Sequence, residues 1–87
     1  ALTEFCENMD LGPEAKYHSQ EVIDRIYRLL DQEPERTRNI VLMRLDGYSF
    51  YEIGTKFGIS ESSARVIDFR TKEKLRKILK KEGFADE

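Results

Sequence analysis

Apolar residues in the first half of the chain recur at spacings of three and four, the period of an amphipathic helix. The first run can be capped by Ser19 and is stopped by Pro34; its apolar positions are Val22, Ile23, Ile26, Tyr27, Leu29 and Leu30. A second run starts at about Pro34 and ends at Gly47, a residue suited to the left-handed position after a helix; its apolar positions are Ile40, Val41, Leu42 and Leu45. Two helices are therefore predicted before residue 48.

A short third helix is predicted after residue 49. Ser49 followed by Glu52 forms a capping box, in which the side chain of each residue accepts a hydrogen bond from the backbone N–H of the other. The helix ends at Gly58 and turns three side chains inward, namely Phe50, Ile53 and Phe57. Tyr48 and Tyr51 are interpreted as half-buried packing residues near this turn.

The last helix is the longest that the pattern predicts, over about residues 61–82. Ser60 can cap its start. Gly83 and Phe84 predict a Schellman-type end, in which Phe84 folds back on Leu79. No alternating strand pattern is present, so the predicted fold class is all-α with four helices and no winged elements.

The last two helices are joined by a three-residue turn, as in a helix-turn-helix. Gly58 can take the positive φ of such a turn, and Gly54 lets the next helix approach closely. The apolar wedge that would fix the crossing angle consists of Ile53, Phe57, Ile59, Ala64 and Ile67. An ordinary helical hairpin with a glycine corner is the alternative, but it needs only Gly58 and has no need for a small residue at Gly54.

The last helix has two distinct faces. With Arg65 placed at zero and 100° per residue, a core stripe falls between about 200° and 280°; it contains Ala64, Ile67, Thr71, Leu75 and Ile78. Asp68 lies at the margin, near 300°, so a slight rotation of the helix is expected. The opposite face, from 0° to about 140°, carries Arg65, Val66, Phe69, Arg70, Glu73, Arg76, Lys77 and Lys80.

The N-terminal half of this opposite face has the chemistry of a recognition helix, which inserts into the major groove of DNA. Arginine can pair bidentately with guanine, and Val66 and Phe69 could contact thymine methyl groups. Farther along, Lys77 and Lys80 are placed to reach phosphates. The alternative for Phe69 is that its side chain swings round to cover a neighbouring helix.

Charge is distributed unevenly along the chain. The formal net charge is -2, but residues 1–35 carry three bases against nine acids and residues 36–87 carry twelve bases against eight acids. Residues 62–81 alone hold eight bases and two acids. Such a basic stretch favours phosphate as a partner, although a solvated helix face is the other interpretation. Residues 1–17 are acidic, contain the breaker pair Gly12-Pro13, and are predicted to be a flexible linker or arm before a domain at 18–87.

Composition narrows the class of protein. With 87 residues, the chain is long enough for one small domain. The longest uninterrupted apolar run is residues 40–43, so no membrane segment is expected. One cysteine and one histidine, Cys6 and His18, allow no internal disulfide and too few ligands for a structural zinc site. A cytoplasmic binding module without metal or cofactor is therefore expected. An enzyme built on these two residues is disfavoured because no orienting group accompanies them.

Residues 33–78 resemble region four of bacterial RNA polymerase sigma factors, especially the compact extracytoplasmic-function and other alternative types. The motifs that carry the resemblance are Pro34-Glu35, the run from Arg44 to Ser49 (RLDGYS), Glu52-Ile53-Gly54, Phe57-Gly58-Ile59-Ser60 and Lys74-Leu75-Arg76. Two positions depart from the pattern. Many members carry Gly-Thr-Val where this chain has residues 62–64, and many carry a leucine-like residue where it has Asp68.

The resemblance implies roles for individual residues. Arg65, Val66, Phe69 and Arg70 would read bases of the promoter element near minus thirty-five. Ser62, Ser63 and Lys72 would hold the DNA backbone together with Lys77 and Lys80. The resemblance further implies that the flap tip of the polymerase beta subunit is a partner, that an anti-sigma protein is another, and that the acidic first third is the tail of a linker from a region-two domain.

Two other functional classes stay open at this point. A free-standing transcription regulator, dimerising on a palindrome, shares the helix-turn-helix; it needs a self-complementary apolar face, for which the candidates are Tyr17, Tyr48, Tyr51 and Phe84. A protein-interaction bundle without a DNA role would explain the acidic half better than the basic half. A monomeric DNA-binding domain is the prediction that fits the whole pattern.

Overall fold

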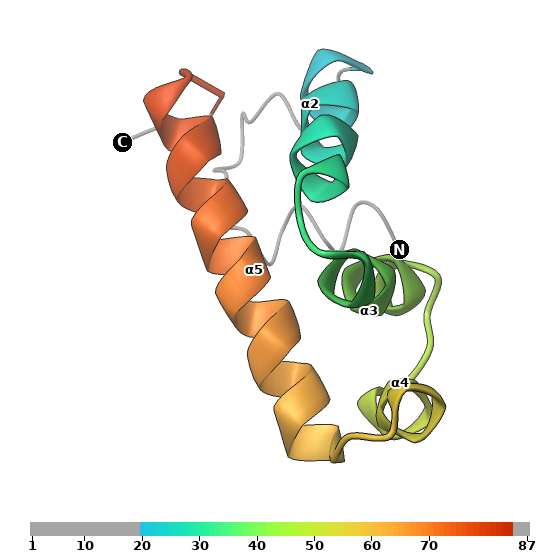
Figure 1. The fold of residues 1–87 in the computed structure, drawn as a ribbon. Helices are drawn as coiled ribbons and strands as arrows, with labels where there is room; N and C mark the ends of the chain where they lie inside the picture. The colour runs from blue at the N-terminus through green and yellow to red at the C-terminus, as the bar shows by residue number, and fades with distance from the viewer. Residues whose placement is uncertain (1–19, 85–87) are drawn as a thin grey trace.

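The computed structural model describes residues 20–84 and contains four helices in that range. They are α2 (Gln20–Asp31), α3 (Glu35–Leu45), α4 (Phe50–Phe57) and α5 (Glu61–Lys81). No strand occurs among the described residues, which confirms the all-α fold class. Figure 1 shows α5 running along one side of the molecule, with α2, α3 and α4 arranged along its length. The predicted arm at 1–17 and the cap at Ser19 lie outside the described residues.

The helix ends follow the local hydrogen-bond chemistry of the sequence. Glu52 donates its backbone N–H to Ser49 Oγ at 3.0 Å, and Ser49 donates its own to the Glu52 carboxylate at 2.9 Å. At the end of α5, Phe84 N–H donates to the carbonyl of Leu79 at 2.9 Å and Gly83 N–H to that of Lys80 at 3.1 Å. The predicted capping box and Schellman-type end are therefore both confirmed.

Two apolar clusters form the core, and α5 contributes to both. The first joins α2, α3 and the C-terminal half of α5 through Val22, Ile26, Leu29, Leu30, Val41, Leu45, Leu75 and Leu79. The second joins α3, α4 and the N-terminal half of α5 through Ile40, Ile53 and Ala64. Tyr27, predicted to face inward, is instead exposed, since the other apolar residues of α2 already fill the contact with α5.

The α5 helix is rotated from the orientation that its apolar pattern predicts. Its buried residues are Ala64, Asp68, Thr71, Leu75 and Leu79. Ile67 and Ile78, which the pattern places in the core stripe, are only partly buried. The centre of the buried stripe therefore shifts by about 40° on the helical wheel. The shift brings Leu79 into the first cluster with α2, and it places the carboxylate of Asp68 inside the protein.

Two ion pairs connect α5 to the first half of the chain. Arg25 on α2 contacts Glu82 just after α5, with Nε donating at 2.8 Å and Nη2 at 2.6 Å. Lys74 on α5 lies 2.9 Å from the carboxylate of Glu33, in the link between α2 and α3. The hydrogen bonds from Arg25 hold the pKa of Glu82 below its ordinary value.

Glu82→Gln is expected to reduce the acid sensitivity of folding. A carboxylate whose pKa is lowered by folding stabilises the protein above its unfolded pKa, near 4.3; this contribution is lost as the pH falls through the lower folded pKa. The variant should therefore melt slightly lower than the wild type at pH 7, and the difference should vanish toward pH 3. Thermal unfolding from pH 3 to pH 7 measures it. A difference that stays constant with pH would mean that the carboxylate charge is not involved.

Candidate nucleic-acid interface

The corner between α4 and α5 depends on a glycine that leaves no room for a side chain. A Cβ atom built on Gly54 would lie 2.6 Å from the carbonyl oxygen of Ile59 and 3.2 Å from the backbone of Ser60. Ile59 N–H donates to the Gly54 carbonyl at 2.9 Å. The sequence prediction that Gly54 permits a close approach is confirmed, but the approaching group is the backbone of the turn, not the body of α5. Gly58 has the expected positive φ of 70°.

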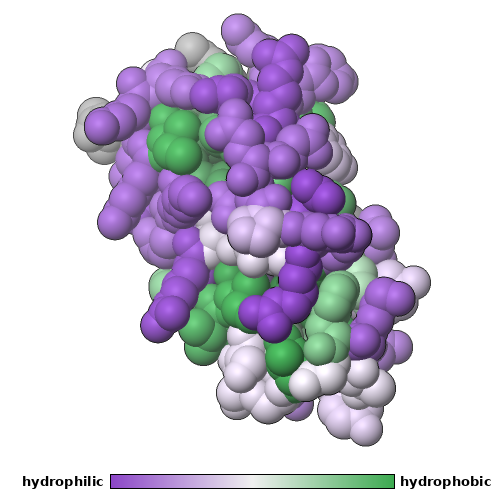
Figure 2. Space-filling view, in the orientation of Figure 1, coloured by the Kyte–Doolittle hydropathy of each residue, from purple (hydrophilic) through white to green (hydrophobic). Residues whose placement is uncertain are grey.

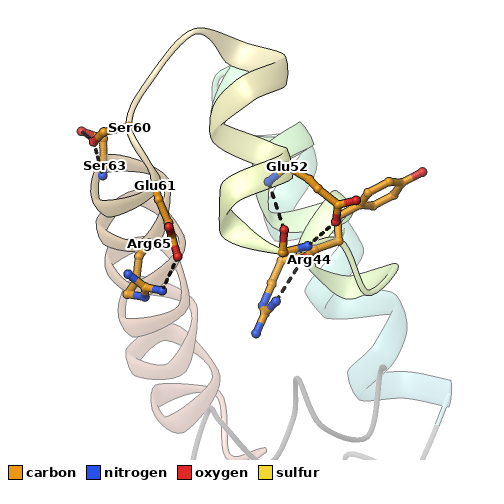
Figure 3. Close-up of polar contacts among 8 residues, drawn as sticks. Arg44, Glu52, Ser60, Glu61, Ser63 and Arg65 are labelled. Atoms are coloured by element: carbon orange, nitrogen blue, oxygen red, sulfur yellow. Dashed lines mark hydrogen bonds and ion pairs between the residues drawn. The ribbon is translucent and has the colours of Figure 1, made fainter.

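The first turn of α5 is held by its serines. Ser60 Oγ accepts the backbone N–H of Ser63 at 3.0 Å, and the two hydroxyl groups lie 3.0 Å apart (Figure 3). The hydroxyl of Ser63 is therefore engaged within the cap. Ser62 is exposed beside it. In this turn Ser62 is exposed at the surface, whereas the backbone N–H of Ser63 is taken up by the cap.

The exposed face of α5 carries apolar and basic side chains together. Val66 is 44% exposed and Phe69 is 62% exposed. The expectation that Phe69 points outward is thus confirmed, and the alternative that it covers a neighbouring helix is wrong. Arg70 and Lys77 are exposed on the same side, and Lys80 is partly exposed. Five of the predicted contact residues therefore share the solvent-facing side of α5, four of them exposed and Lys80 partly so.

A groove of about 360 Å³ borders this face on the side toward α3 and α4. Its cations are Arg44, Arg65, Lys72 and Arg76, its rings are Phe50 and Phe69, and its carboxylates are Asp68 and Glu73. In the half of the molecule that holds α4 and the start of α5, Figure 2 shows apolar side chains with hydrophilic ones lying across them. The predicted base-reading residue Arg65 therefore stands at the groove edge of α5, whereas Val66 and Arg70 lie farther round the helix.

The ring of Phe50 contacts two of the arginines that line the groove. The guanidinium carbon of Arg44 lies 4.4 Å from the centre of the Phe50 ring, and that of Arg65 lies 4.9 Å from it. Such cation–π contacts hold a guanidinium in place without neutralising it. Arg44 also donates to the carbonyl of Tyr48 at 3.0 Å, and Arg65 pairs with Glu61 at 3.2 Å (Figure 3).

Sequence reasoning missed Arg44 and Phe50 as members of this surface. They belong to α3 and α4, and their place beside α5 follows from the packing of three helices. The only sequence signal for Arg44 was its position in the run RLDGYS of the resemblance, whereas Phe50 follows that run and was predicted to point inward.

The side chain of Lys72 is not at the exposed surface, where a residue that contacts the DNA backbone would be expected. Its side chain is only 12% exposed, and its ammonium group is 2.9 Å from the carboxylate of Asp68, which is itself 6% exposed. The rotation of α5 explains the pair, because it turns Asp68 inward and brings Lys72, one turn later, to the wall of the groove. The backbone role predicted for Lys72 is not tested by the structure, but the side chain is engaged inside the protein, so we do not count Lys72 among the proposed DNA contacts.

The acids of α5 are matched to particular cations. Arg76 donates to Glu73 at 2.8 Å, which lowers the pKa of that carboxyl, and the nearby charges of Lys77 and Lys80 lower it further. Glu73 therefore stays ionised at neutral pH and offsets part of the positive charge beside the exposed face.

The two tyrosines near the turn between α3 and α4 differ in exposure. Tyr51 is 69% exposed, so its interpretation as a half-buried packing residue is wrong, whereas Tyr48, at 45% exposed, is half-buried as interpreted. Phe84 packs against the first core cluster instead of standing free. Among residues 20–84, no helix is long and apolar enough to cross a membrane.

Comparison with known proteins matches the sequence to one family. The family described as "Sigma-70, region 4" matches residues 23–75, a span that includes α3, α4 and most of α5. The chain is also 33% identical over 70 residues to "RNA polymerase sigma factor CarQ" of Myxococcus xanthus. That alignment covers 80% of this chain and 37% of the relative, so the chain spans well under half of the relative's length. No solved structure matches the chain significantly.

Proposed function

The chain belongs to the sigma-70 region 4 family, and on this premise we propose that it is the domain of an alternative sigma factor that reads the promoter element near minus thirty-five. It acts by binding and not by catalysis. In this function the domain directs RNA polymerase to its promoters, with duplex DNA on one side and the polymerase on the other.

The observation that carries the proposal is the exposed face of α5. A large aromatic side chain, Phe69, stands 62% exposed in the N-terminal half of the helix, between Val66 and Arg70. Exposed apolar surface of this kind, edged by cations, marks a binding site. A major groove offers it thymine methyl groups for the apolar side chains and guanine acceptors for the arginine.

The predicted contacts divide into readers and clamps. Val66, Phe69, Arg70 and, from the groove edge, Arg65 read base edges. Ser62 and Ser63 in the first turn hold the phosphate backbone, because a helix start favours anions. Lys77 and Lys80 hold it farther along. Contacts to phosphates position the helix, and contacts to bases give it sequence preference.

The partners follow from the same proposal. The flap tip of the polymerase beta subunit holds the domain in place, and an anti-sigma protein is a candidate regulator. A single recognition module buries on the order of 600–1,000 Å² on DNA, so the isolated domain binds weakly as a monomer. Attachment to the polymerase raises the effective concentration of the domain at the promoter. Binding at the promoter therefore depends on both the DNA and the polymerase. The domain acts in the cytoplasm.

Selection from a pool of random duplex DNA tests the proposed function. The domain is tethered to the polymerase flap fragment, and selection is carried out at two salt concentrations. An enriched, short, non-palindromic motif whose binding weakens with salt is expected, because one helix reads one half-site and the lysines neutralise phosphates.

Two other results would contradict it. A palindromic motif would indicate the dimeric regulator, for which the exposed Tyr48 and Tyr51 are the available apolar surface. Absence of any enriched sequence, together with binding that ignores salt, would indicate a protein-interaction bundle. The same selection with Phe69→Ala shows whether any enrichment depends on the exposed face of α5.

A further inference from the structure

Six of the eight basic side chains of α5 fall into two sets; the other two are Lys74, which pairs with Glu33, and the exposed Lys81 near the end of the helix. Arg65, Lys72 and Arg76 line the groove, and each is paired with an acid three or four residues before it on the same helix, namely Glu61, Asp68 and Glu73. Arg70, Lys77 and Lys80 lie on the exposed side, and no ion pair within 4.0 Å forms between them and any described acid. Each cation of the first set has an acidic partner on α5, whereas the cations of the second set have none among the described residues.

The three internal pairs differ in burial. The side chains of Arg65 and Glu61 are at least half exposed, so water and salt screen their attraction and a DNA phosphate can replace the carboxylate. The Asp68–Lys72 pair is nine-tenths buried on average, with 6% of the Asp68 side chain and 12% of the Lys72 side chain exposed. In such surroundings the attraction is screened far less. Asp68 therefore holds Lys72 much more firmly than Glu61 holds Arg65.

Stability does not explain the buried pair. Burial removes two charges from water, and an apolar pair of similar volume is commonly as stable or more stable. In addition, Asp68 Oδ1 is buried and accepts no hydrogen bond from the described residues. Its charge is thus left incompletely satisfied, which costs free energy. The effect of Asp68 that remains is on its neighbour: it fixes the position of the Lys72 ammonium group.

We propose that Asp68 is a positioning residue that acts as an internal counter-ion in place of a phosphate, holds Lys72 out of the DNA interface and so limits sequence-independent affinity for DNA. The inference rests on the proposed DNA-binding function. Each lysine that reaches a phosphate adds to binding on every sequence alike. By removing one such contact, Asp68 leaves a larger share of the binding free energy to the residues that read bases.

The test measures sequence-independent binding of the full 87-residue chain to a random-sequence duplex as a function of salt. Asp68→Asn keeps the shape of the side chain but removes its charge, so the ion pair that holds Lys72 at the groove wall is lost. We expect the slope of log affinity against log salt to steepen by about 0.9, the value for one more phosphate. Between 50 and 200 mM salt this adds roughly a threefold loss of affinity. Asp68→Asn with Lys72→Met should return the slope to that of the wild type.

Asp24→Asn is the matched control, because it makes the same change of net charge at an exposed residue of α2. Its slope should stay that of the wild type. An Asp68→Asn slope equal to that of the control overturns the inference. So does a steeper slope that Lys72→Met fails to reverse, because the effect then does not pass through Lys72.

A second variant tests the inference even where Asp68→Asn does not fold. Asp68→Leu with Lys72→Met replaces the pair by apolar side chains and leaves the net charge unchanged. The slope should equal that of the wild type, since Lys72 makes no phosphate contact to lose. A slope shallower by about 0.9 would show that Lys72 contacts DNA after all. If the wild-type chain binds no duplex at any salt concentration, the proposed function itself fails; if it binds and the slopes disagree, only the role of Asp68 fails.

Discussion

Gly54→Ala is expected to destabilise the domain by about 1–3 kcal/mol or more, as overpacking does in a tightly packed interior. The new Cβ would lie 2.6 Å from the carbonyl oxygen of Ile59, which is backbone and cannot move aside without opening the turn. In an unobstructed helix the same change would stabilise by roughly 0.5–1 kcal/mol. The sign of the effect therefore reports the close approach directly, and denaturant unfolding monitored by circular dichroism measures it.

Gly58→Ala is the comparison for this effect. A Cβ on Gly58 would meet no atom within 4 Å, but the residue has a φ of +70°. The expected cost is that of a left-handed conformation alone, about 1–2 kcal/mol. If Gly54→Ala proves as stable as the wild type, the corner between α4 and α5 is looser than its geometry indicates. DNA binding should fall with stability in Gly54→Ala, because the turn sets the angle of α5.

Arg70→Ala is expected to reduce discrimination between the selected duplex and its single-base variants by about 1–3 kcal/mol, the usual value of one bidentate contact to a base. Arg70 is exposed on α5 and pairs with no described acid, so its removal should leave the fold intact. Fluorescence anisotropy on a set of duplexes that differ at one base pair measures the change. The loss should appear at one or two positions of the sequence and not at the others.

Lys77→Ala is the matched variant, one exposed cation of the same helix two turns later. It should weaken all duplexes alike and make the salt slope shallower by about 0.9. The division into readers and clamps is wrong if both variants lose the same affinity on every duplex.

Local chemistry made most of the fold predictable from the sequence. The capping box at Ser49 and Glu52, the cap at Ser60 and the end at Gly83 each involve residues within a few positions of one another. Their hydrogen bonds are therefore determined without knowledge of the rest of the molecule. The exposure of Phe69 was predictable for a related reason, because it lies opposite the apolar stripe of its own helix.

Features that depend on contacts between helices were not predictable in the same way. The marginal position of Asp68 indicated a slight rotation of α5, but the burial of Leu79 follows from its packing against α2, a contact between residues about fifty positions apart. That rotation buries Asp68 and draws Lys72 away from the surface assigned to it. The arginine of α3 beside the ring of Phe50, and the exposure of Tyr51, depend equally on how neighbouring helices are placed.

The α5 helix contributes to both core clusters, so a tilt at one end of the helix displaces its other end. Its 21 residues extend about 30 Å, with the base-reading residues near one end and Leu79 near the other. A tilt of only about 4° around the far end displaces the first turn by roughly 2 Å over such a length, which is enough to break a hydrogen bond to a base edge. The packing of α2 against Leu75 and Leu79 would therefore help to fix the position of the proposed base-reading residues, although it lies at the other end of the helix. Under the proposed function, side chains at one end of the helix thus set how accurately the other end can read a promoter.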